Sequence, residues 1–539
     1  MVAKPSDLRQ ALPAILVGIV AGGGGFLFGY DSGVISGLLQ MEPFKEEFGS
    51  YYDYNIPSNR IASDNPAKPG WALSTSDTSL VVSLLSLGTF IGALSASYIG
   101  DFKGRRPALM LALVVFSVGV LVQCVSKGLA PFCIGRVIAG LGVGLISSLV
   151  PLYQSETAPR WVRGAIVAAY QFFITIGLFV ASLVDNATKD REDNSAWLIP
   201  VSMQFIFAFV LFVGLVFLPE SPRFRVKQGR VEDAAHILAY LNGRPVDDPI
   251  VRAELQEVID QHEMELKESA SGWSEILRTG NGKTLQRISS GMVLQALTQL
   301  TGINFIFYYG TTFFLSTGAK NPFTFSVIAN LVNVLSTPLS FIIFDKVGRR
   351  PSFLAGAIEM SICQFFVAAI GTASKVSNHT AQRTCVAFVM LYIVGFATTW
   401  GPGGWIYCAE SYSLAYRSKG NSLSTASNWA FNFAIGYMTP YLVDSGPGKA
   451  GLGPKIFFIW AVSCLGCTAF AWLCIYETKG LSLEEVDNLF RHSNARTSAK
   501  YNEHLKSIRG TDVESGTPLG GVVTEAEETP SPAEEDIKE

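Results

Sequence analysis

The chain has 539 residues, of which 49% are hydrophobic and only 16% are charged, and its mean hydropathy is positive at +0.31. These values exclude an ordinary water-soluble domain and suit a protein solvated by lipid. The formal net charge of −3 and the lack of any basic tract also exclude nucleic acid as a partner.

Long apolar runs predict about twelve membrane spans, because each has roughly 20 residues or more and can cross the core of a bilayer. The runs fall at 12–38, 78–99, 107–126, 130–152, 164–184, 196–218, 286–315, 322–344, 351–373, 384–408, 421–443 and 455–476. The first run is too long, and is followed by too many others, to be a cleaved signal peptide. The sequence therefore predicts an all-α membrane protein with twelve transmembrane helices.

Polar segments divide these spans into two sets of six. The expected units are a cytoplasmic N-terminal tail (1–11), a six-helix bundle (12–218), cytoplasmic linker helices (219–285), a second six-helix bundle (286–476) and a cytoplasmic C-terminal tail (477–539). Apolar spacing at the helical period in 231–241 and 251–266 predicts the short amphipathic linker helices. The Pro, Thr and Glu residues of the last segment predict that this tail is largely disordered.

The distribution of Lys and Arg predicts the orientation of the chain. Clusters such as Lys103-x-Arg105-Arg106 and Arg223-x-Arg225-x-Lys227 fall in alternate loops, whereas the loops between them are acidic or sparsely basic, as in 185–193. Because basic residues are retained in the cytoplasm, both termini are expected there. Two glycosylation sequons, Asn186-Ala-Thr188 and Asn378-His-Thr380, fall in loops that this orientation places outside the cell.

Two charged motifs occur once in each predicted bundle, as internal repeats of secondary transporters do. Asp101-x-x-Gly104-Arg105-Arg106 returns as Asp345-x-x-Gly348-Arg349-Arg350, and Glu156-x6-Arg163 returns as Glu410-x6-Arg417. The glycines permit a tight reversal, and the four arginines of the paired motifs can donate hydrogen bonds to the two glutamates. We expect this network to form a cytoplasmic gate that breaks when the inner face opens. The alternative is that the basic residues only fix the topology.

A carboxylate and a guanidinium lie at comparable depth in two of the spans. Asp31 in the first span would cost several kcal/mol to bury alone, and Arg136 in the fourth span is the expected partner. One interpretation is a static ion pair between two helices. The other is a proton site, in which deprotonated Asp31 pairs with Arg136 and protonation releases the pair.

Amide and aromatic side chains gather in the seventh, tenth and eleventh spans. The seventh reads Gln295-x3-Gln299-x2-Gly302-x-Asn304-x3-Tyr308-Tyr309, the tenth contains Gly401-Pro402-Gly403-Gly404-Trp405, which should break its helix, and the eleventh contains Asn428-Trp429-x2-Asn432. Uncharged amides beside aromatic rings suit a neutral polyhydroxylated ligand, whose hydroxyls both donate and accept. Any single amide could instead serve helix packing.

At these residues the chain resembles the sugar porter family of the major facilitator superfamily, and within it the fungal hexose transporters. Ile138-x-Gly140-Leu141-x2-Gly144-x8-Tyr153-x2-Glu156-x6-Arg163 fits the longest family motif, and Pro219-Glu-Ser-Pro-Arg223 and Glu477-Thr-Lys-Gly480 match the markers that close each half. The resemblance covers roughly 12–490. It implies two pseudo-symmetric six-helix bundles and a sugar site formed by Gln171, Gln299, Asn304, Asn333, Trp405 and Asn428, with Gln295, Phe396 and Trp429 nearby.

Three residues depart from the pattern or are unexplained by it. Thr298 stands where the family has the first Gln of a pair, which removes one expected sugar ligand. Ser97 replaces a leading glycine of the first charged motif. Glu359 is a carboxylate in the ninth span for which the sequence offers no partner.

The resemblance implies a monomeric, non-enzymatic transporter of monosaccharides, with glucose as the expected hexose, in a fungal plasma membrane. We expect alternating access and proton symport, without a cofactor or metal. The eight cysteines fall in or beside the spans and are interpreted as buried packing residues. The alternatives are downhill transport of hexoses or polyols and a sugar sensor that does not transport, although a sensor is expected to carry a longer cytoplasmic extension than this tail.

Overall fold

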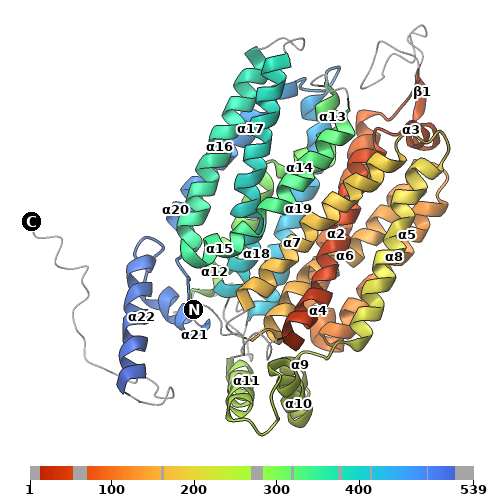
Figure 1. Cartoon of the computed structure of the whole chain (residues 1–539). Coiled ribbons are helices and arrows are strands. Elements are labelled where there is room, and N and C mark those ends of the chain that lie inside the picture. The colour runs from red at the N-terminus through yellow and green to blue at the C-terminus, as the bar shows by residue number, and fades with distance from the viewer. Residues whose placement is uncertain are drawn as a thin grey trace, which may run out of the picture.

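A computed structural model describes residues 12–52, 70–159, 163–268, 283–316, 321–373, 379–412, 416–481 and 483–515. The chain forms two helical bundles that stand side by side, with the first half of the chain in one and the second half in the other (Figure 1). In the text below, the loop side is the end that carries α3 and β1, and the linker side is the end that carries α9 to α11.

The first bundle contains six long helices. They are α2 (Leu12–Leu38), α4 (Thr75–Lys103), α5 (Arg105–Val125), α6 (Leu129–Thr157), α7 (Arg163–Thr188) and α8 (Ser195–Phe217). On the loop side, the short helix α3 (Glu42–Phe48) precedes an antiparallel pair of strands, β1 (Ser50–Tyr52) and β2 (Gly70–Ala72), in which Tyr51 lies opposite Trp71.

Glycines let the helices of this bundle approach closely. A Cβ atom at Gly140 on α6 would overlap the carbonyl oxygen of Leu85 on α4, and one at Gly144 would overlap that of Thr89. Cβ atoms at Gly88 and Gly92 on α4 would likewise overlap backbone carbonyl oxygens of α6. The glycines of the longest sequence motif therefore bring two membrane helices into backbone contact, as small residues do in lipid.

The second bundle also has six spans, but three of them are interrupted. Its elements are α12 (Thr284–Leu300), α13 (Ile303–Ser316), α14 (Pro322–Ser336), α15 (Leu339–Lys346), α16 (Arg349–Ala373), α17 (His379–Thr398), α18 (Trp400–Ser411), α19 (Arg417–Val443), the 3-10 turn η4 (Gly453–Lys455) and α20 (Ile456–Cys474). Ten spans in the described chain are long and apolar enough to cross a membrane by length and composition. The broken span α12–α13 and the more polar α19 complete the twelve.

The breaks have local causes. Gly302, between α12 and α13, has φ +84° and lies against the ring of Trp460, where no Cβ atom would fit. In the tenth span the break falls at Thr399, before the glycine-rich motif rather than within it. The prediction that this motif breaks the helix of the tenth span is confirmed: Pro402 cannot donate to the carbonyl oxygen of Thr398, so α17 ends there and α18 begins with Pro402 in its first turn, where proline is tolerated.

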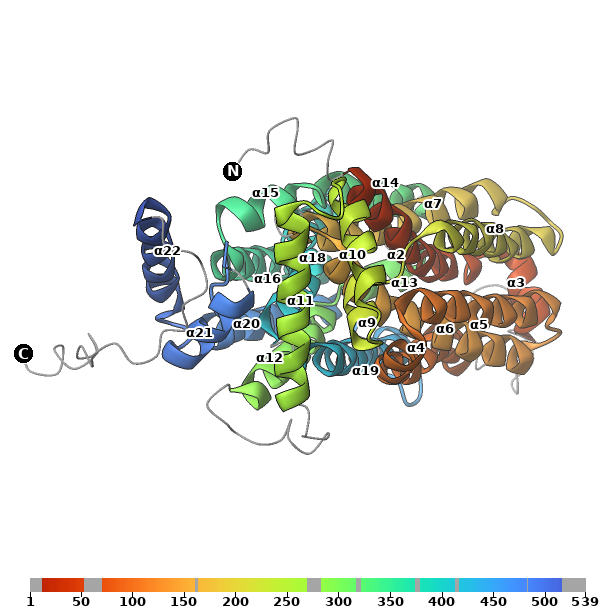
Figure 2. The same cartoon turned by 90° about the horizontal axis from the view of Figure 1, so that it is seen from below.

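Short helices cover the linker side. They are α9 (Pro222–Lys227), α10 (Val231–Asn242) and α11 (Pro249–Glu268), which confirms the expected linker helices. Viewed from that side, α10 and α11 lie in front of the boundary between the bundles (Figure 2).

The segment after the last span is more ordered than the sequence predicts. It forms α21 (Leu483–His492) and α22 (Ser498–Ser515). Arg287 at the start of α12 forms an ion pair with Asp487 on α21, and the side-chain amide of Asn502 on α22 donates to the carbonyl oxygen of Glu477 at 2.8 Å. The expected disorder is wrong as far as residue 515, and 516–539 lie outside the described residues.

Candidate functional site

Five amides form a hydrogen-bonded network on α12, α13 and α19. Gln299 donates to the side-chain oxygen of Asn428 at 2.9 Å, and Asn428 donates to that of Gln295 at 2.8 Å. A third side-chain oxygen of the network, Oε1 of Gln299, accepts from Asn304 and, at 3.2 Å, from Asn432. The helix break at Gly302 lets Asn304 on α13 reach back to α12. The structure thus brings four of the predicted amides together, namely Gln295, Gln299, Asn304 and Asn428, and adds Asn432.

Other hydrogen bonds join this network to the first bundle. Trp405 on α18 donates to the side-chain oxygen of Gln171 on α7 at 3.2 Å. The side-chain oxygen of Asn432 accepts from Ser86 on α4 at 2.6 Å and from Tyr308 at 3.1 Å. The candidate sugar site therefore lies between the two bundles. Its amides can exchange hydrogen-bond partners only when the bundles move or a ligand binds.

Aromatic rings line the same region. Trp429 is fully buried, donates to the hydroxyl of Ser147 on α6 at 3.2 Å and meets the ring of Phe28 edge-on at 4.9 Å between centroids. The ring of Trp405 meets that of Tyr170 in the same way at 5.6 Å. Sequence reasoning missed Phe28, Ser147 and Tyr170, because their spans show no polar clustering that would single them out.

Three further candidates lie outside the amide network. Asn333 on α14 is buried, and both its side-chain oxygen and nitrogen lack a hydrogen-bond partner in the described chain. Phe396 on α17 is buried and packs on Gly401 at the start of α18. The hydroxyl of Thr298 bonds to the carbonyl oxygen of Leu294 in its own helix at 2.9 Å, so it is occupied locally.

The expected intramembrane ion pair is present. Arg136 donates to Oδ1 of Asp31 at 3.0 Å, and both side chains are buried. The second oxygen of Asp31 has no hydrogen-bond partner in the described chain. A carboxylate in this position can bind either the guanidinium or a proton, because only one oxygen is held.

The charged repeats form two matching networks at the linker side. Arg105 holds Glu156 with two hydrogen bonds of 3.0 and 3.1 Å, and Arg349 holds Glu410 with two of 3.1 and 2.6 Å. Such bidentate pairs are the geometry that guanidinium favours. Each network ties together helices of its own bundle.

The other members of the repeats differ from expectation. Arg106 and Arg350 do not bind the glutamates but donate to the carbonyl oxygens of Val216 and Trp472 at 2.6 and 2.9 Å. Arg105 donates to the carbonyl oxygen of Gly100 at 3.0 Å, as Arg349 does to that of Phe344 at 2.9 Å. Asp101 also accepts from Arg105 at 3.1 Å, whereas the corresponding Asp345 is exposed. Arg417 is buried at the start of α19, and Arg163 begins α7 with a side chain outside the described part.

Glu220 and Glu477 are the functional candidates that sequence reasoning missed. Glu220 accepts from the backbone N–H groups of Arg105 and Arg106 at 3.0 and 3.3 Å, and Glu477 accepts from those of Arg349 and Arg350 at 3.0 and 3.1 Å. Each carboxylate therefore caps the first turn of the helix that carries the gate arginine. Burial raises the pKa of Glu220, and the bonds from Ser221 and the arginines oppose this rise.

The cap explains the glycine before each arginine pair. Gly104 has φ +96° and Gly348 has φ +108°, and a Cβ atom at either position would meet the carboxylate of the capping glutamate. The two motifs that close each half, around Pro219 and Glu477, had no role assigned from sequence. The available signal was that each half places a glutamate directly after its last span.

The structure does not place the first glycosylation sequon in a loop. Asn186 lies in the last turn of α7, where its side-chain oxygen accepts from Lys189 at 3.0 Å, and Thr188 is buried. The segment 185–193 was expected to be a loop, but its first residues continue the helix because their backbone bonds persist to Lys189. Asn378 lies outside the described residues.

Glu359, unexplained by the sequence, faces α17. It accepts from the thiol of Cys363 at 3.2 Å, and its other carboxylate oxygen lies where a Cβ atom of Gly395 would be. Gly395 thus provides the space for this side chain.

The fold and the site together define a membrane transporter of the major facilitator type, with a polar site between two repeated bundles. Residues 17–490 match the family described as "Sugar (and other) transporter". The chain therefore belongs to the sugar porter family of the major facilitator superfamily, a family of transporters rather than enzymes.

Individual relatives agree with this assignment. "Major facilitator-type transporter ecdD" of Aspergillus rugulosus is 45% identical, covering 91% of this chain and 90% of its own. "Probable glucose transporter rco-3" of Neurospora crassa is 40% identical, covering 90% and 81%. "High glucose sensor RGT2" of Saccharomyces cerevisiae is 39% identical and covers 94% of this chain, which spans only 64% of the sensor.

Among solved structures, the proton:xylose symporter XylE bound to 6-bromo-6-deoxy-D-glucose is similar. It has a TM-score of 0.74 and 26% sequence identity, and it covers 89% of this chain and 100% of its own.

Proposed function

We propose that this protein carries a hexose, with glucose as the first candidate, across the plasma membrane by alternating access. The observation that carries the proposal is the amide network of Gln295, Gln299, Asn428 and Asn432, which is bonded to Ser86 of the other bundle. A sugar hydroxyl can replace each amide partner, because it both donates and accepts. Binding would therefore exchange bonds between the bundles for bonds to the sugar.

The linker side faces the cytoplasm in this proposal. Lys103, Lys227, Lys346 and the gate arginines lie at that end, and basic residues are retained in the cytoplasm. The two bundles then move as units of a single polypeptide around the central site, and α9 to α11 bridge them on the inner face. A monomer is sufficient for this cycle, because both bundles come from one chain.

Proton coupling through Asp31 and Arg136 is the finer part of the proposal. A proton on Asp31 would break the 3.0 Å bond to Arg136 and change the packing of α2 on α6. The structural relative XylE is described as a proton:xylose symporter, which supports symport. Downhill transport is the alternative, and in that case the pair is structural.

Uptake of labelled glucose tests transport directly. The chain is expressed in cells that lack their own hexose carriers, and uptake is compared with that of the double variant Gln299→Ala, Asn428→Ala. Saturable uptake by the native chain, lost in the variant at equal surface expression, is expected. Equal uptake by cells with and without the native chain would contradict transport.

A sugar sensor is the second candidate, because the relative RGT2 is described as a high glucose sensor. A sensor would bind glucose at the same amides and change conformation without net flux. Glucose-dependent change of conformation in reconstituted vesicles that show no glucose entry would select this alternative.

A further inference from the structure

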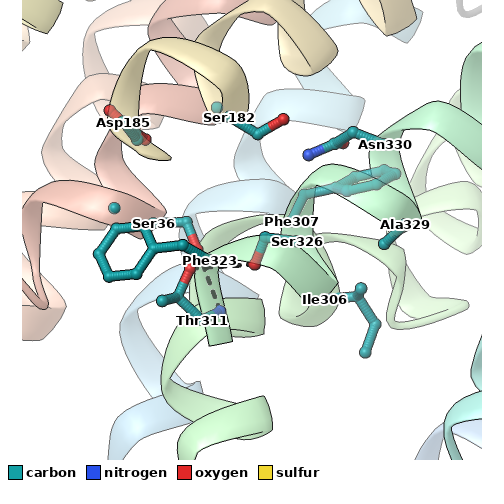
Figure 3. Close-up of a pocket in the computed structure, with 12 residues that line it drawn as sticks. Ser36, Ser182, Asp185, Ile306, Phe307, Thr311, Phe323, Ser326, Ala329 and Asn330 are labelled. Carbon is teal, nitrogen blue, oxygen red and sulfur yellow. Dashed lines mark hydrogen bonds between the residues drawn. The ribbon is translucent and has the colours of Figure 1, made fainter. Parts of the chain in front are cut away.

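A polar cavity lies between the bundles near the loop side, away from the amide network. It is lined by α2 and α7 of the first bundle and by α13 and α14 of the second, and its volume of about 10 Å³ is space for a single water molecule. Figure 3 shows Asp185, Ser182 and Asn330 above Ser36 and Thr311 around this space. None of these residues belongs to the sites described above.

Asp185 is the only carboxylate among the residues that line this cavity. It is 2% exposed, and its Oδ1 atom has no hydrogen-bond partner in the described chain. Its other oxygen lies against Gly37 on α2, where a Cβ atom would overlap it. Asp185 also lies in the last turn of α7, the negative end of a helix dipole, which disfavours a second negative charge.

Among the described residues, the helices around Asp185 offer no cation to balance its ionised form. Helices α2, α8, α13 and α14 contain no Lys, Arg or His, and the titratable group facing it from α2 is Tyr30, whose hydroxyl bonds to the carbonyl oxygen of Pro200. Beyond it on α7, Lys189 holds Asn186 and lies over the ring of Phe323 at 5.5 Å. The carboxylate on α2 is Asp31, and it is bound to Arg136.

Both bundles contribute to the burial of Asp185: one carboxylate oxygen packs on Gly37 of α2, and α13 and α14 of the second bundle close the cavity beside it. Ser36 on α2 bonds to Thr311 on α13 at 3.1 Å, Thr311 bonds to Ser326 on α14 at 3.0 Å, and Gln40 donates to Thr312 at 2.7 Å. The bonds of Ser36 and Gln40 cross from one bundle to the other, and the bond between Thr311 and Ser326 joins α13 to α14 within the second bundle. When the bundles separate here, water reaches the cavity and can solvate a charge; when they close, an unpaired carboxylate loses that water at a cost of several kcal/mol.

We propose that Asp185 is a proton-binding site of the loop side, taking up one proton as α13 and α14 close on α2 and α7 and releasing it as they separate. The proton neutralises the buried carboxylate, whose O–H can donate to an acceptor in the cavity such as Oδ1 of Asn330, which also lacks a partner in the described chain. Low pH therefore favours the closed loop side and high pH the open one. The inference rests on the alternating access proposed above.

The test measures the opening of the loop side as a function of pH. Spin labels are attached to Glu46→Cys on α3 and Ser445→Cys after α19, which are exposed at the loop-side ends of opposite bundles, whereas the eight native cysteines are buried or half-buried. The distance between labels is measured in vesicles from about pH 5 to about pH 8. The population of the long distance should increase with pH.

The variant Asp185→Asn should remove this increase and keep the short distance at every pH, because the amide imitates the protonated acid. Asp185→Glu, which remains titratable, and Ser182→Ala, which lines the same cavity without charge, should both retain the increase. A pH response in Asp185→Asn equal to that of the native chain would overturn the inference.

The labels also separate this inference from the proposed function. Addition of glucose at constant pH should shift the distances in the native chain. If glucose has no effect, alternating access with this sugar fails. If glucose shifts the distances but Asp185→Asn responds to pH as the native chain does, only the role of Asp185 fails.

Discussion

Individual amides differ in how many partners they hold, and this number predicts the effect of their removal. Gln299 is the hub, because it donates to Asn428 and accepts from Asn304 and Asn432. Phe396 and Thr298 make no such bonds to the network in the described chain. The contribution of each candidate to sugar binding should follow this order.

Replacing Gln299 by Ala should therefore weaken sugar uptake strongly. Each lost hydrogen bond to a buried polar group is worth about 1–3 kcal/mol, which corresponds to an increase in apparent KM of roughly tenfold or more. The measurement is the concentration dependence of glucose uptake. Gln256→Ala, in the exposed part of α11, is the matched control and should keep the native value. An unchanged KM in Gln299→Ala would contradict the site.

Asp31 and Asp185 are both buried carboxylates, but only Asp31 holds a guanidinium. If Asp31 exchanges a proton in each cycle, Asp31→Asn should abolish uphill accumulation of sugar while binding persists. Addition of sugar should make a weakly buffered suspension of cells more alkaline with the native chain and not with the variant. Native uptake that never exceeds the external concentration and ignores a protonophore would identify a facilitator instead.

At the scale of elements, the beginnings of α5 and α16 are built in the same way. Each starts after a glycine with positive φ, is capped by a glutamate from a later segment and places its first arginine on a second glutamate. In each bundle, the cap therefore ties the segment after the last span to the beginning of the third span. Loss of either carboxylate should loosen one bundle without changing the other.

The pair of Arg349 and Glu410 tests the gate. Arg349→Ala should shift the protein toward the inward-open state, because both bonds to Glu410 are lost. Arg349→Lys keeps the charge needed for topology but cannot form the bidentate pair. Labelling of a cysteine introduced on the inner face reports the shift. If both variants keep native labelling and native transport, the pair fixes the topology only.

Removal of the cap should act on stability. Glu477→Ala leaves the first N–H groups of α16 unbonded, and loss of an N-terminal cap costs about 1–2 kcal/mol. The melting temperature of the purified protein should fall, whereas Asn488→Ala at an exposed position of α21 should leave it unchanged. A melting temperature equal to that of the native protein in Glu477→Ala would show that the cap is dispensable.

At the scale of the whole molecule, the state of the protein depends on hydrogen bonds between the bundles. Thr75 at the start of α4 donates to Asp444 after α19 at 2.6 Å, close to the loop side. Bonds of this kind join the two bundles, so they must break when that side opens. They therefore set the balance between the open and closed states.

Thr75→Val should favour the open loop side. A hydrogen bond to a charged group contributes about 1.5–3 kcal/mol, so the ratio of open to closed molecules should rise by roughly tenfold or more. The spin labels at Glu46→Cys and Ser445→Cys report the ratio. Ser95→Ala, which loses a bond within α4 to Gly92, is the control. A ratio that is the same in both variants would contradict the assigned role.

The sequence by itself determined the twelve spans, the two halves and the family. Polar backbone and charge are costly to bury in lipid, so each span requires a long apolar run, and the repeated charged motifs are visible between these runs. It also identified Asp31 with Arg136 and most of the amides, since polar residues are conspicuous among apolar ones. These features are local in the chain or repeat along it.

Only the tertiary structure decided which groups meet. The caps by Glu220 and Glu477, the carbonyl partners of Arg106 and Arg350, and the aromatic neighbours of the site join residues far apart in the chain. The sequence pattern predicts a loop at Asp185, yet Asp185 lies in α7 and packs on Gly37, where it is buried. The reason is physical: burial and hydrogen bonding between helices depend on how the helices pack, and this packing has no local signature in the sequence.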